Sequence, residues 1–233
     1  MRVLGIIPAR GGSKGVPNKN IYPILGKPLV HYTIDSALNS KKLDKVVLSS
    51  DSDKILDACA AFNIAFHKRE NKLATDVSPV IKTVMNILNR FEQDNIFFDA
   101  VLLLQPTSPI KTGKDIDNAI KLLEANESVN SVISVVEMDD THPARMYWEN
   151  EDHMLKPILP EFEKYRRQDI PKALYRNGVL YLTRTSALRN ENELMVKPTM
   201  PYKMNPNYLV NIDEPRDLLI AEVLIKAWQE NKL

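Results

Sequence analysis

The residues best suited to chemistry in this chain lie in the run from Ala9 to Asn20. Three of the chain's seven glycines fall within this run, at positions 11, 12 and 15. The run also contains the cations Arg10, Lys14 and Lys19. Glycine lets the backbone turn tightly and approach a ligand, while Lys and Arg add charge and donors that suit phosphate. The run therefore predicts a loop that wraps the polyphosphate of a nucleotide.

Residue spacing excludes two common phosphate-binding loops. A Walker loop requires Gly-Lys followed by Ser or Thr, whereas the Gly-Lys pairs at positions 26 and 113 are followed by Pro28 and Asp115. The dinucleotide fingerprint GxGxxG is absent, because the glycines lie at positions 11, 12 and 15. The alternative is a glycine-rich surface turn whose lysines only face solvent. Three cations directly after an apolar segment favour the phosphate loop.

Size and composition are those of a globular protein. With 233 residues, of which 44% are apolar, the chain can form one large domain, or one domain with an appended arm. A net charge of +1 gives no broad attraction to nucleic acid or to membranes, so the loop cations act locally. The chain shows no signal peptide and no apolar stretch long enough to span a bilayer, which predicts a cytoplasmic protein.

Cysteine and histidine chemistry is not expected. The single cysteine, Cys59, excludes an internal disulfide and a cysteine metal cluster, and its surroundings predict a small apolar residue on a helix. The four histidines are scattered and show no metal-binding spacing. A catalytic or zinc-binding histidine is therefore not predicted.

Alternating strand and helix patterns must position the loop. Buried strands are expected at residues 3–7, 45–49, 100–104, 131–136 and 178–183. Helices are expected at residues 28–38, from 52 or 53 to 61, after Pro79, from about Thr112, and from about 215 to 230. This succession predicts an α/β fold with a mostly parallel sheet covered by helices on both faces.

The pattern changes between about Met138 and Lys172, where apolar runs shrink, prolines recur and aromatic residues alternate with charges. A long floppy insertion is one interpretation. Long structureless loops are uncommon, however, and aromatic side chains need a packing surface. We therefore predict a protruding β-rich dimerisation arm at residues 138–172 that packs on a second subunit. The α/β domain then comprises residues 1–137 and 173–233.

Polar segments follow several of the predicted strands. In open parallel sheets, ligands bind outside the carboxyl ends of the strands. The segments expected there are residues 8–10, 49–51, 105–109, 175–178 and 211–213. Together they suit nucleotide phosphates, a metal ion and a polyhydroxylated acid. Simpler interpretations are also open, since residues 105–109 could be a helix-capping turn, Asn177-Gly178 a turn, and Asp213 an N-cap before Pro215.

These segments resemble the acylneuraminate cytidylyltransferases, which comprise CMP-sialic acid synthetases and bacterial relatives that activate other nonulosonic acids. The resemblance runs from Met1 to about Ile220. It rests on the loop and on residues 104–109, 167–169, 176–178 and 211–215. It implies a Rossmann-like nucleotide-diphospho-sugar transferase fold and a homodimer. The loop alone is shared with the cytidylyltransferases for 3-deoxy-manno-octulosonate, whereas the later motifs favour the acylneuraminate branch.

The resemblance implies that CTP and a nine-carbon acid sugar, N-acetylneuraminate or a relative such as legionaminate, give a CMP-sugar and pyrophosphate. The anomeric hydroxyl attacks the α-phosphorus with assistance from Mg²⁺, or from Mn²⁺ in its place. Two alternatives stay open. One is a cytidylyltransferase for the eight-carbon octulosonate, and the other is a catalytically silent nucleotide-binding module.

The resemblance also implies roles for individual residues. The catalytic residues are Arg10, Lys19 and Asp213. The nucleotide-binding residues are Ala9, Arg10, Gly11, Gly12, Ser13, Lys14, Lys19, Asn20, Arg69 and Ser78. The sugar-binding residues are Gln105, Arg167, Asn177 and Tyr181, of which Arg167 suits a carboxylate because its fork can bind both oxygens.

One position departs from the family pattern. Many relatives carry Asp-Ile-Asp where this chain has Asn211-Ile212-Asp213. Asp213 is the expected metal ligand, while Asn211 offers only a neutral amide oxygen, which puts a second metal position in doubt. A mechanism with Asn211 as base is disfavoured, and a metal-polarised sugar hydroxyl is favoured.

Overall fold

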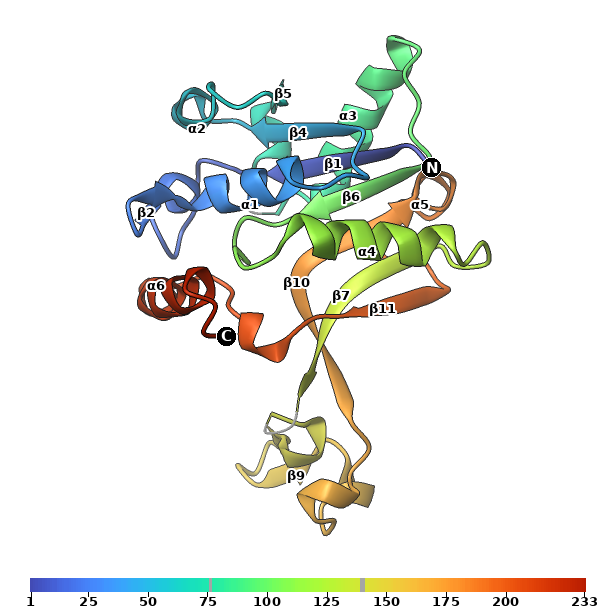
Figure 1. Cartoon of the computed structure of the whole chain (residues 1–233). Coiled ribbons are helices and arrows are strands. Elements are labelled where there is room, and N and C mark those ends of the chain that lie inside the picture. The colour runs from blue at the N-terminus through green and yellow to red at the C-terminus, as the bar shows by residue number, and fades with distance from the viewer. Residues whose placement is uncertain (76, 139–140) are drawn as a thin grey trace.

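A seven-stranded sheet forms the centre of the molecule, in the order β11-β7-β10-β6-β1-β4-β5 (Figure 1). The computed structural model describes residues 1–75, 77–138 and 141–233. The strands are β1 Val3–Pro8, β4 Lys45–Ser50, β5 Ala65–Lys68, β6 Ala100–Leu104, β7 Ser131–Met138, β10 Ala173–Arg184 and β11 Thr199–Lys203. Neighbours pair parallel except β10, which is antiparallel to β6 and β7. The predicted mostly parallel sheet is confirmed.

Helices cover both faces of this sheet, as predicted (Figure 1). One face packs against α1 Leu29–Leu38, α2 Asp53–Ala58 and α4 Gly113–Glu124. The other face packs against α3 Val80–Gln93 and α5 Thr185–Glu191. The last helix, α6 Pro215–Gln229, packs with α1 and with a small hairpin formed by β2 Pro23–Ile24 and β3 Lys27–Pro28. No helix among the described residues is long and apolar enough to cross a membrane.

The strand β1 shows why the sheet needs two helical layers. Val3 and Ile7 belong to the cluster under α1 and α4, while Leu4 and Ile6 belong to the cluster under α3, and all four side chains are fully buried. Successive side chains on a strand point to opposite faces. A strand that is buried on both faces therefore needs a continuous apolar run, which is what β1 has.

Some elements differ from the sequence prediction. The helix α2 ends at Ala58, three residues earlier than expected, and Cys59 is buried at its C-terminal end. The N-cap of α6 is Glu214, not Asp213, and its carboxylate is matched by Asp217 in a capping box. The strand β10 begins at Ala173, five residues before the expected start at Gly178, so the Asn177-Gly178 pair lies inside the strand. A register shift between Arg176 and Tyr181 and a φ of +76° at Gly178 mark a bulge there.

The segment between β7 and β10 projects away from the sheet as an arm (Figure 1). It contains one small hairpin, β8 Tyr147–Glu149 with β9 Leu155–Pro157, and three 3₁₀ turns at residues 143–145, 160–162 and 167–169. The described part of the arm is thus less rich in strands than expected. Pro143 and Pro160 begin two of the turns, because proline fixes φ and donates no backbone hydrogen bond. Residues 139 and 140 of the expected arm lie outside the described residues.

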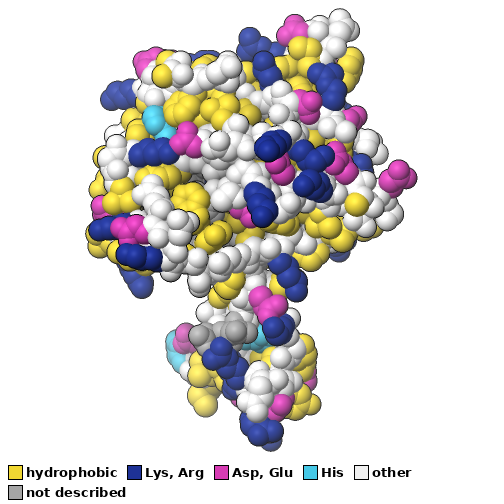
Figure 2. All heavy atoms as spheres, viewed as in Figure 1, with side chains coloured by type: hydrophobic (Ala, Val, Ile, Leu, Met, Phe, Trp, Pro, Cys, Tyr) yellow, Lys and Arg dark blue, Asp and Glu magenta, His cyan; other side chains and the backbone are white. Residues whose placement is uncertain are grey.

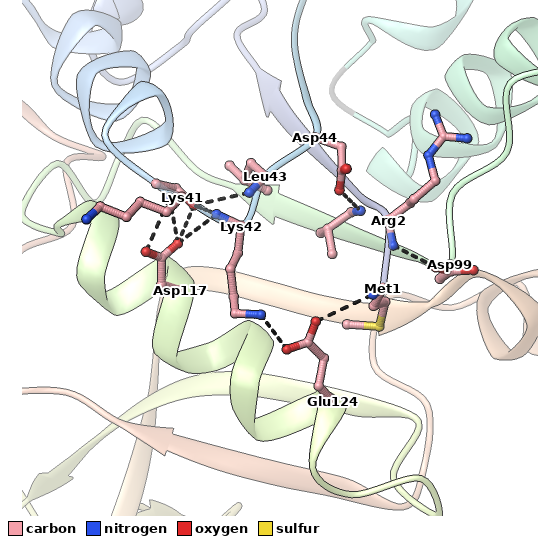
Figure 3. Close-up of polar contacts among 11 residues, drawn as sticks. Met1, Arg2, Lys41, Lys42, Leu43, Asp44, Asp99, Asp117 and Glu124 are labelled. Carbon is pink, nitrogen blue, oxygen red and sulfur yellow. Dashed lines mark hydrogen bonds and ion pairs between the residues drawn. The ribbon is translucent and has the colours of Figure 1, made fainter.

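Carboxylates fasten the loops at the amino ends of the strands (Figure 3). Asp117 on α4 accepts hydrogen bonds from the backbone N–H groups of Lys41 and Lys42 at 2.9 and 3.1 Å, and from the Ser40 hydroxyl at 2.6 Å. Glu124 at the end of the same helix pairs with the Lys42 ammonium at 2.6 Å. These bonds fix the loops at the amino ends of the strands. The carboxyl ends, on the opposite side of the sheet, are where ligands bind in such folds.

Candidate active site

A cavity of about 560 Å³ opens at the carboxyl ends of the parallel strands. It lies where β1, β5 and β6 end and where the 211–213 segment approaches the loop after β1. The structure brings together here a set of predicted residues that are far apart in sequence, namely Arg10, Ser13, Lys14, Lys19, Asn20, Arg69, Ser78, Gln105, Asn211 and Asp213. Among the described residues that line the cavity, four are Lys or Arg and one, Asp213, is acidic. Such a lining suits a polyanion.

Backbone N–H groups at the start of the glycine-rich loop donate hydrogen bonds to β4 and to the residue directly after it. The Ala9 N–H donates to the Ser49 carbonyl at 2.9 Å, and the Gly11 N–H donates to Asp51 Oδ1 at 2.9 Å. The Asn20 side-chain amide donates to the Arg10 carbonyl at 2.8 Å and so closes the loop from its far end. These contacts anchor the loop at its start and at its end.

Two of the loop glycines are required by close packing. A Cβ atom at Gly15 would lie 2.0 Å from the Asp213 carbonyl oxygen, and a Cβ atom at Gly11 would lie 2.8 Å from the Ser52 Cβ. At Gly12 a Cβ atom would meet nothing within 4 Å. Gly15 thus lets the loop pack directly on the 211–213 segment.

Lys19 joins this segment to the loop. Its ammonium donates to the Ile212 carbonyl at 2.7 Å and pairs with Asp213 Oδ1 at 2.9 Å. The Asn211 side-chain amide donates to the other carboxylate oxygen of Asp213. An aspartate at position 211 could not donate this bond and would repel Asp213. Asn211 therefore stabilises a single carboxylate at the rim of the cavity.

The single carboxylate at the rim, Asp213, fits a magnesium ion whose other ligands would be phosphate oxygens and water. The Asp213 side chain is 65% exposed. Among the described residues no group of three or more His, Cys, Asp or Glu side chains could hold a metal. Mg²⁺ is commonly held by one or two carboxylates together with phosphate oxygens and water. Asp213 can supply the one protein carboxylate of such a site.

Arg69 is a buried cation on the wall of the cavity. Its Nε donates to the Ser49 hydroxyl at 3.2 Å and its Nη2 donates to the Ser49 carbonyl at 3.0 Å. Burial lowers the pKa of the guanidinium, Asp51 raises it and Arg10 lowers it. Arginine stays charged despite such a shift, so a partly desolvated positive charge faces the cavity.

Ser78 also lines the cavity, just before α3. Its hydroxyl oxygen is buried and has no hydrogen-bond partner among the described residues. A buried hydroxyl without a partner costs free energy. A ligand group in the cavity could accept or donate the missing bond.

Lys111 is a residue that the sequence analysis missed. Its side chain is fully buried, and its ammonium donates to Thr33 Oγ1 at 2.9 Å, to the Ser108 carbonyl at 2.6 Å and to the Gln105 carbonyl at 3.2 Å. Burial lowers its pKa to about 7, against a smaller raising effect of Asp115. Lys111 therefore holds the turn that presents Gln105. Lys111 lies two positions beyond the polar segment 105–109, and no pattern in the sequence marks it.

The bulge in β10 lies against the same turn. The Ser108 hydroxyl donates to the Asn177 carbonyl at 3.3 Å. A Cβ atom at Gly178 would lie 3.3 Å from Gln105 Oε1. The two segments predicted to bind sugar, around Gln105 and Asn177, are thus neighbours.

Other predicted residues do not line this cavity. Ala9 is fully buried in the core, and Gly11 and Gly12 are absent from the cavity lining. Asn177 is also buried, and its side-chain amide contacts the Met204 sulfur at 3.4 Å. Tyr181 packs on the α3 face of the sheet, with the Arg176 guanidinium 5.9 Å from its ring centre. Their ligand contacts stay predictions.

Arg167 lies on the arm. It lines a separate cavity of about 300 Å³ together with His142, Arg145 and Lys172. Within one chain the structure therefore does not bring Arg167 to the cavity that contains Gln105. Its sugar-binding role stays a prediction.

Comparison with known proteins agrees with this geometry. The sequence profile of the cytidylyltransferase family matches residues 4–218. The chain is 34% identical to a CMP-N,N'-diacetyllegionaminic acid synthase of Legionella pneumophila, and 31% identical to a pseudaminic acid cytidylyltransferase of Campylobacter jejuni. Each match covers 99% of both sequences. A solved structure of a CMP:2-keto-3-deoxy-manno-octonic acid synthetase complexed with CTP superimposes with a TM-score of 0.74, at 17% identity, over 99% of this chain and 100% of that one. The resemblance noted from the motifs and the predicted Rossmann-like fold are both confirmed.

Proposed function

The chain belongs to the cytidylyltransferase family of nucleotidyltransferases, and we propose that it uses CTP to activate N-acetylneuraminate or a related nonulosonic acid such as legionaminate. The products are the CMP-sugar and pyrophosphate. One observation carries the proposal: a single cavity joins a cationic glycine loop, Gln105 and the Lys19–Asp213 pair. Full-length similarity to synthases of this sugar class supports the choice of substrate.

The cationic wall accounts for the binding of CTP. Arg10, Lys14, Lys19 and Arg69 surround the cavity, and a nucleoside triphosphate is strongly anionic. Arginine can bind phosphate oxygens through two donors at once, while lysine supplies a compact point charge. Asn20 and the buried Ser78 hydroxyl offer polar contacts to the same nucleotide.

The transfer itself needs positioning and charge stabilisation more than covalent chemistry by the protein. The anomeric hydroxyl of the sugar loses its proton to water as its oxygen forms a bond to the α-phosphorus of CTP. The bond from that phosphorus to the bridging oxygen of the β-phosphate breaks. Arg10 and Lys19 stabilise the negative charge that grows on the departing pyrophosphate. Asp213 holds the Lys19 ammonium in place for this role.

A magnesium ion, or manganese in its place, would be held by Asp213 and would supply further neutralisation of the phosphate oxygens. Asn211 contributes a hydrogen bond to Asp213 and is not assigned as a ligand. Replacement of Asp213 is therefore expected to weaken the binding of the metal ion and to lower activity.

We further propose a homodimer in which the arm contacts a second copy of the chain. Hydrophobic side chains lie among the charged ones on the surface of the arm (Figure 2). Trp148 is 64% exposed, Met154 64% and Leu155 73%. Exposed apolar groups gathered on a projecting segment are typical of an interface. In such a dimer the arm of one copy can bring Arg167 to the Gln105 cavity of the other. A cytoplasmic location stays a prediction.

A substrate panel at fixed CTP and Mg²⁺ tests the proposed function. Pyrophosphate release should occur with N-acetylneuraminate, legionaminate or another nonulosonate, and should be much slower with the eight-carbon octulosonate. Release with the octulosonate alone would establish the first alternative. CTP binding by calorimetry without turnover of any sugar would establish a silent nucleotide-binding module.

A further inference from the structure

A row of four polar side chains, three of them buried, runs from α3 to the wall of the cavity. Asn86 on α3 lies against His67 on β5, with 2.8 Å between Asn86 Oδ1 and His67 Nε2. His67 Nδ1 lies 3.0 Å from the Ser49 hydroxyl, and that oxygen lies 3.2 Å from Arg69 Nε. Ser49 is fully buried, and His67 and Arg69 are 5% and 6% exposed. Of the four, only Arg69 lines the cavity.

The donors and acceptors in this row have a single direction. The Asn86 oxygen only accepts, so His67 Nε2 carries a proton and donates it. In a neutral imidazole Nδ1 is then an acceptor, and the Ser49 hydroxyl donates to it. The Ser49 oxygen is left free to accept from Arg69 Nε. The tautomer of His67 thus determines the orientation of the Ser49 hydroxyl and its hydrogen bond with Arg69.

We propose that His67 is a positioning residue for CTP binding, because its neutral imidazole orients the Ser49 hydroxyl and thereby fixes the Arg69 guanidinium at the cavity wall. The inference rests on the nucleotide-binding role of Arg69 in the proposed function. His67 itself touches no ligand. Ser49 is well placed for this task, since its carbonyl also accepts from Arg69 Nη2 and from the Ala9 N–H at the start of the glycine loop.

Protonation of His67 would break this arrangement. A proton on Nδ1 turns that atom into a donor toward the Ser49 oxygen, which already accepts from Arg69, and the Ser49 hydrogen loses its acceptor. Burial lowers the pKa of His67 below its usual 6.5. The hydrogen bond to Asn86 opposes that shift, Arg69 and Arg90 add to it, and Glu70 opposes it. His67 is therefore neutral at pH 7, and its positioning effect is lost as the pH falls through its pKa.

Equilibrium binding of CTP by calorimetry, without sugar and over a pH series, tests this inference. The His67→Leu variant removes the acceptor and should bind CTP about fivefold more weakly than wild type at neutral pH. The His67→Asn variant keeps an acceptor near Nδ1 and does not titrate in this range, so its affinity relative to wild type should rise as the pH falls. Protonation of CTP itself cancels in these ratios, because every variant meets the same ligand.

A second variant separates positioning from simple packing. Asn86→Asp places a carboxylate beside His67 Nε2, which should raise the pKa of His67 and move the loss of affinity to higher pH. The matched control is His153→Asn on the arm, where the side chain is 87% exposed and the φ of +60° suits asparagine. The control should follow the wild-type profile.

The results that overturn the inference are specific. Wild-type affinity in His67→Leu, or an unchanged pH profile in Asn86→Asp, would each do so. If His67→Leu fails to fold, the profiles of His67→Asn and Asn86→Asp decide. CTP binding that depends on Arg69 and His67 without turnover of any acid sugar would refute the proposed function and leave this inference standing. Undiminished CTP binding in Arg69→Ala would overturn the inference alone.

Discussion

At the scale of single residues, Lys19 has two roles. It lines the cavity, and it joins the glycine loop to Ile212 and Asp213. Lys19→Ala should raise the KM for CTP about tenfold or more, since a charge-assisted bond to phosphate is lost. Its free energy of unfolding should fall by only about 1 kcal/mol, the net worth of an ordinary hydrogen bond. Steady-state kinetics and urea unfolding measure the two effects.

The matched control for Lys19 is Lys54→Ala, which removes an exposed lysine of α2 outside the cavity. It should leave both quantities unchanged. An unaltered KM for CTP in Lys19→Ala would contradict the assignment of this lysine to the phosphates.

Lys111 makes folding stability depend on pH. Its pKa is about 7 in the folded protein and 10.5 when unperturbed. Below pH 7 it is protonated in both states, so the cost of burying the charge is fully present. Between pH 7 and 10.5 the unfolded state binds more protons than the folded state, so stability rises with pH. In Lys111→Met this rise should shrink.

Urea unfolding of wild type and Lys111→Met at pH 7 and at pH 9 measures this difference. The wild-type protein should gain more stability between the two pH values than the variant gains. Equal gains would show that Lys111 does not titrate in this interval in the folded state.

At the scale of elements, the glycine loop works only if it packs on the 211–213 segment. Gly15→Ala places a methyl group 2.0 Å from the Asp213 carbonyl oxygen, so the loop or the segment must move. A displacement of about 1 Å can cost roughly a hundredfold in rate. Gly12→Ala adds its methyl group to open space and should lose much less. Similar losses of pyrophosphate release in the two variants would contradict the packing account.

The elements that the sequence predicted well are those with strong patterns. The strands β1 and β6 are continuous apolar runs, and α3 shows apolar residues at helical spacing. The strands β5 and β11 were not predicted. Both lie at edges of the sheet, where one neighbour suffices, and β11 contains Pro201, which weakens a strand pattern. The helix α5 has only seven residues, too few to show a clear period.

The candidate site divides in the same way. Some site residues are polar and directly follow apolar segments, namely Arg10, Gln105 and Asp213. The sequence could therefore place them at the carboxyl ends of the strands. Lys111 and His67 could not be found in this way. Lys111 is hydrogen-bonded to Thr33, which is 78 positions away. His67 is hydrogen-bonded to Ser49 and Asn86, which are 18 and 19 positions away. Such contacts follow from the packing of α1 and α3 on the sheet, which periodicity does not specify.

At the scale of the whole molecule, the arm and the cavity are expected to meet only in a dimer. The Arg167→Ala variant should have a raised KM for the acid sugar and a nearly unchanged KM for CTP. Gly15→Ala should lose most of its activity through its own cavity while its arm stays intact. Mixing the two variants under conditions that exchange subunits should restore activity, because the Gly15→Ala arm supplies Arg167 to the intact cavity of its partner. No recovery in exchanged dimers would show that Arg167 does not act across subunits.

In the proposed reaction, CMP passes intact from CTP to the anomeric oxygen of a nonulosonic acid. Phosphorus NMR of the protein with CTP, Mg²⁺ and N-acetylneuraminate or legionaminate tests it most directly. We expect the three CTP signals to be replaced by one phosphodiester signal of the CMP-sugar and one of pyrophosphate, in equal molar amounts. Unchanged CTP with every nonulosonate, or release of free CMP or CDP without a sugar phosphodiester, would contradict it.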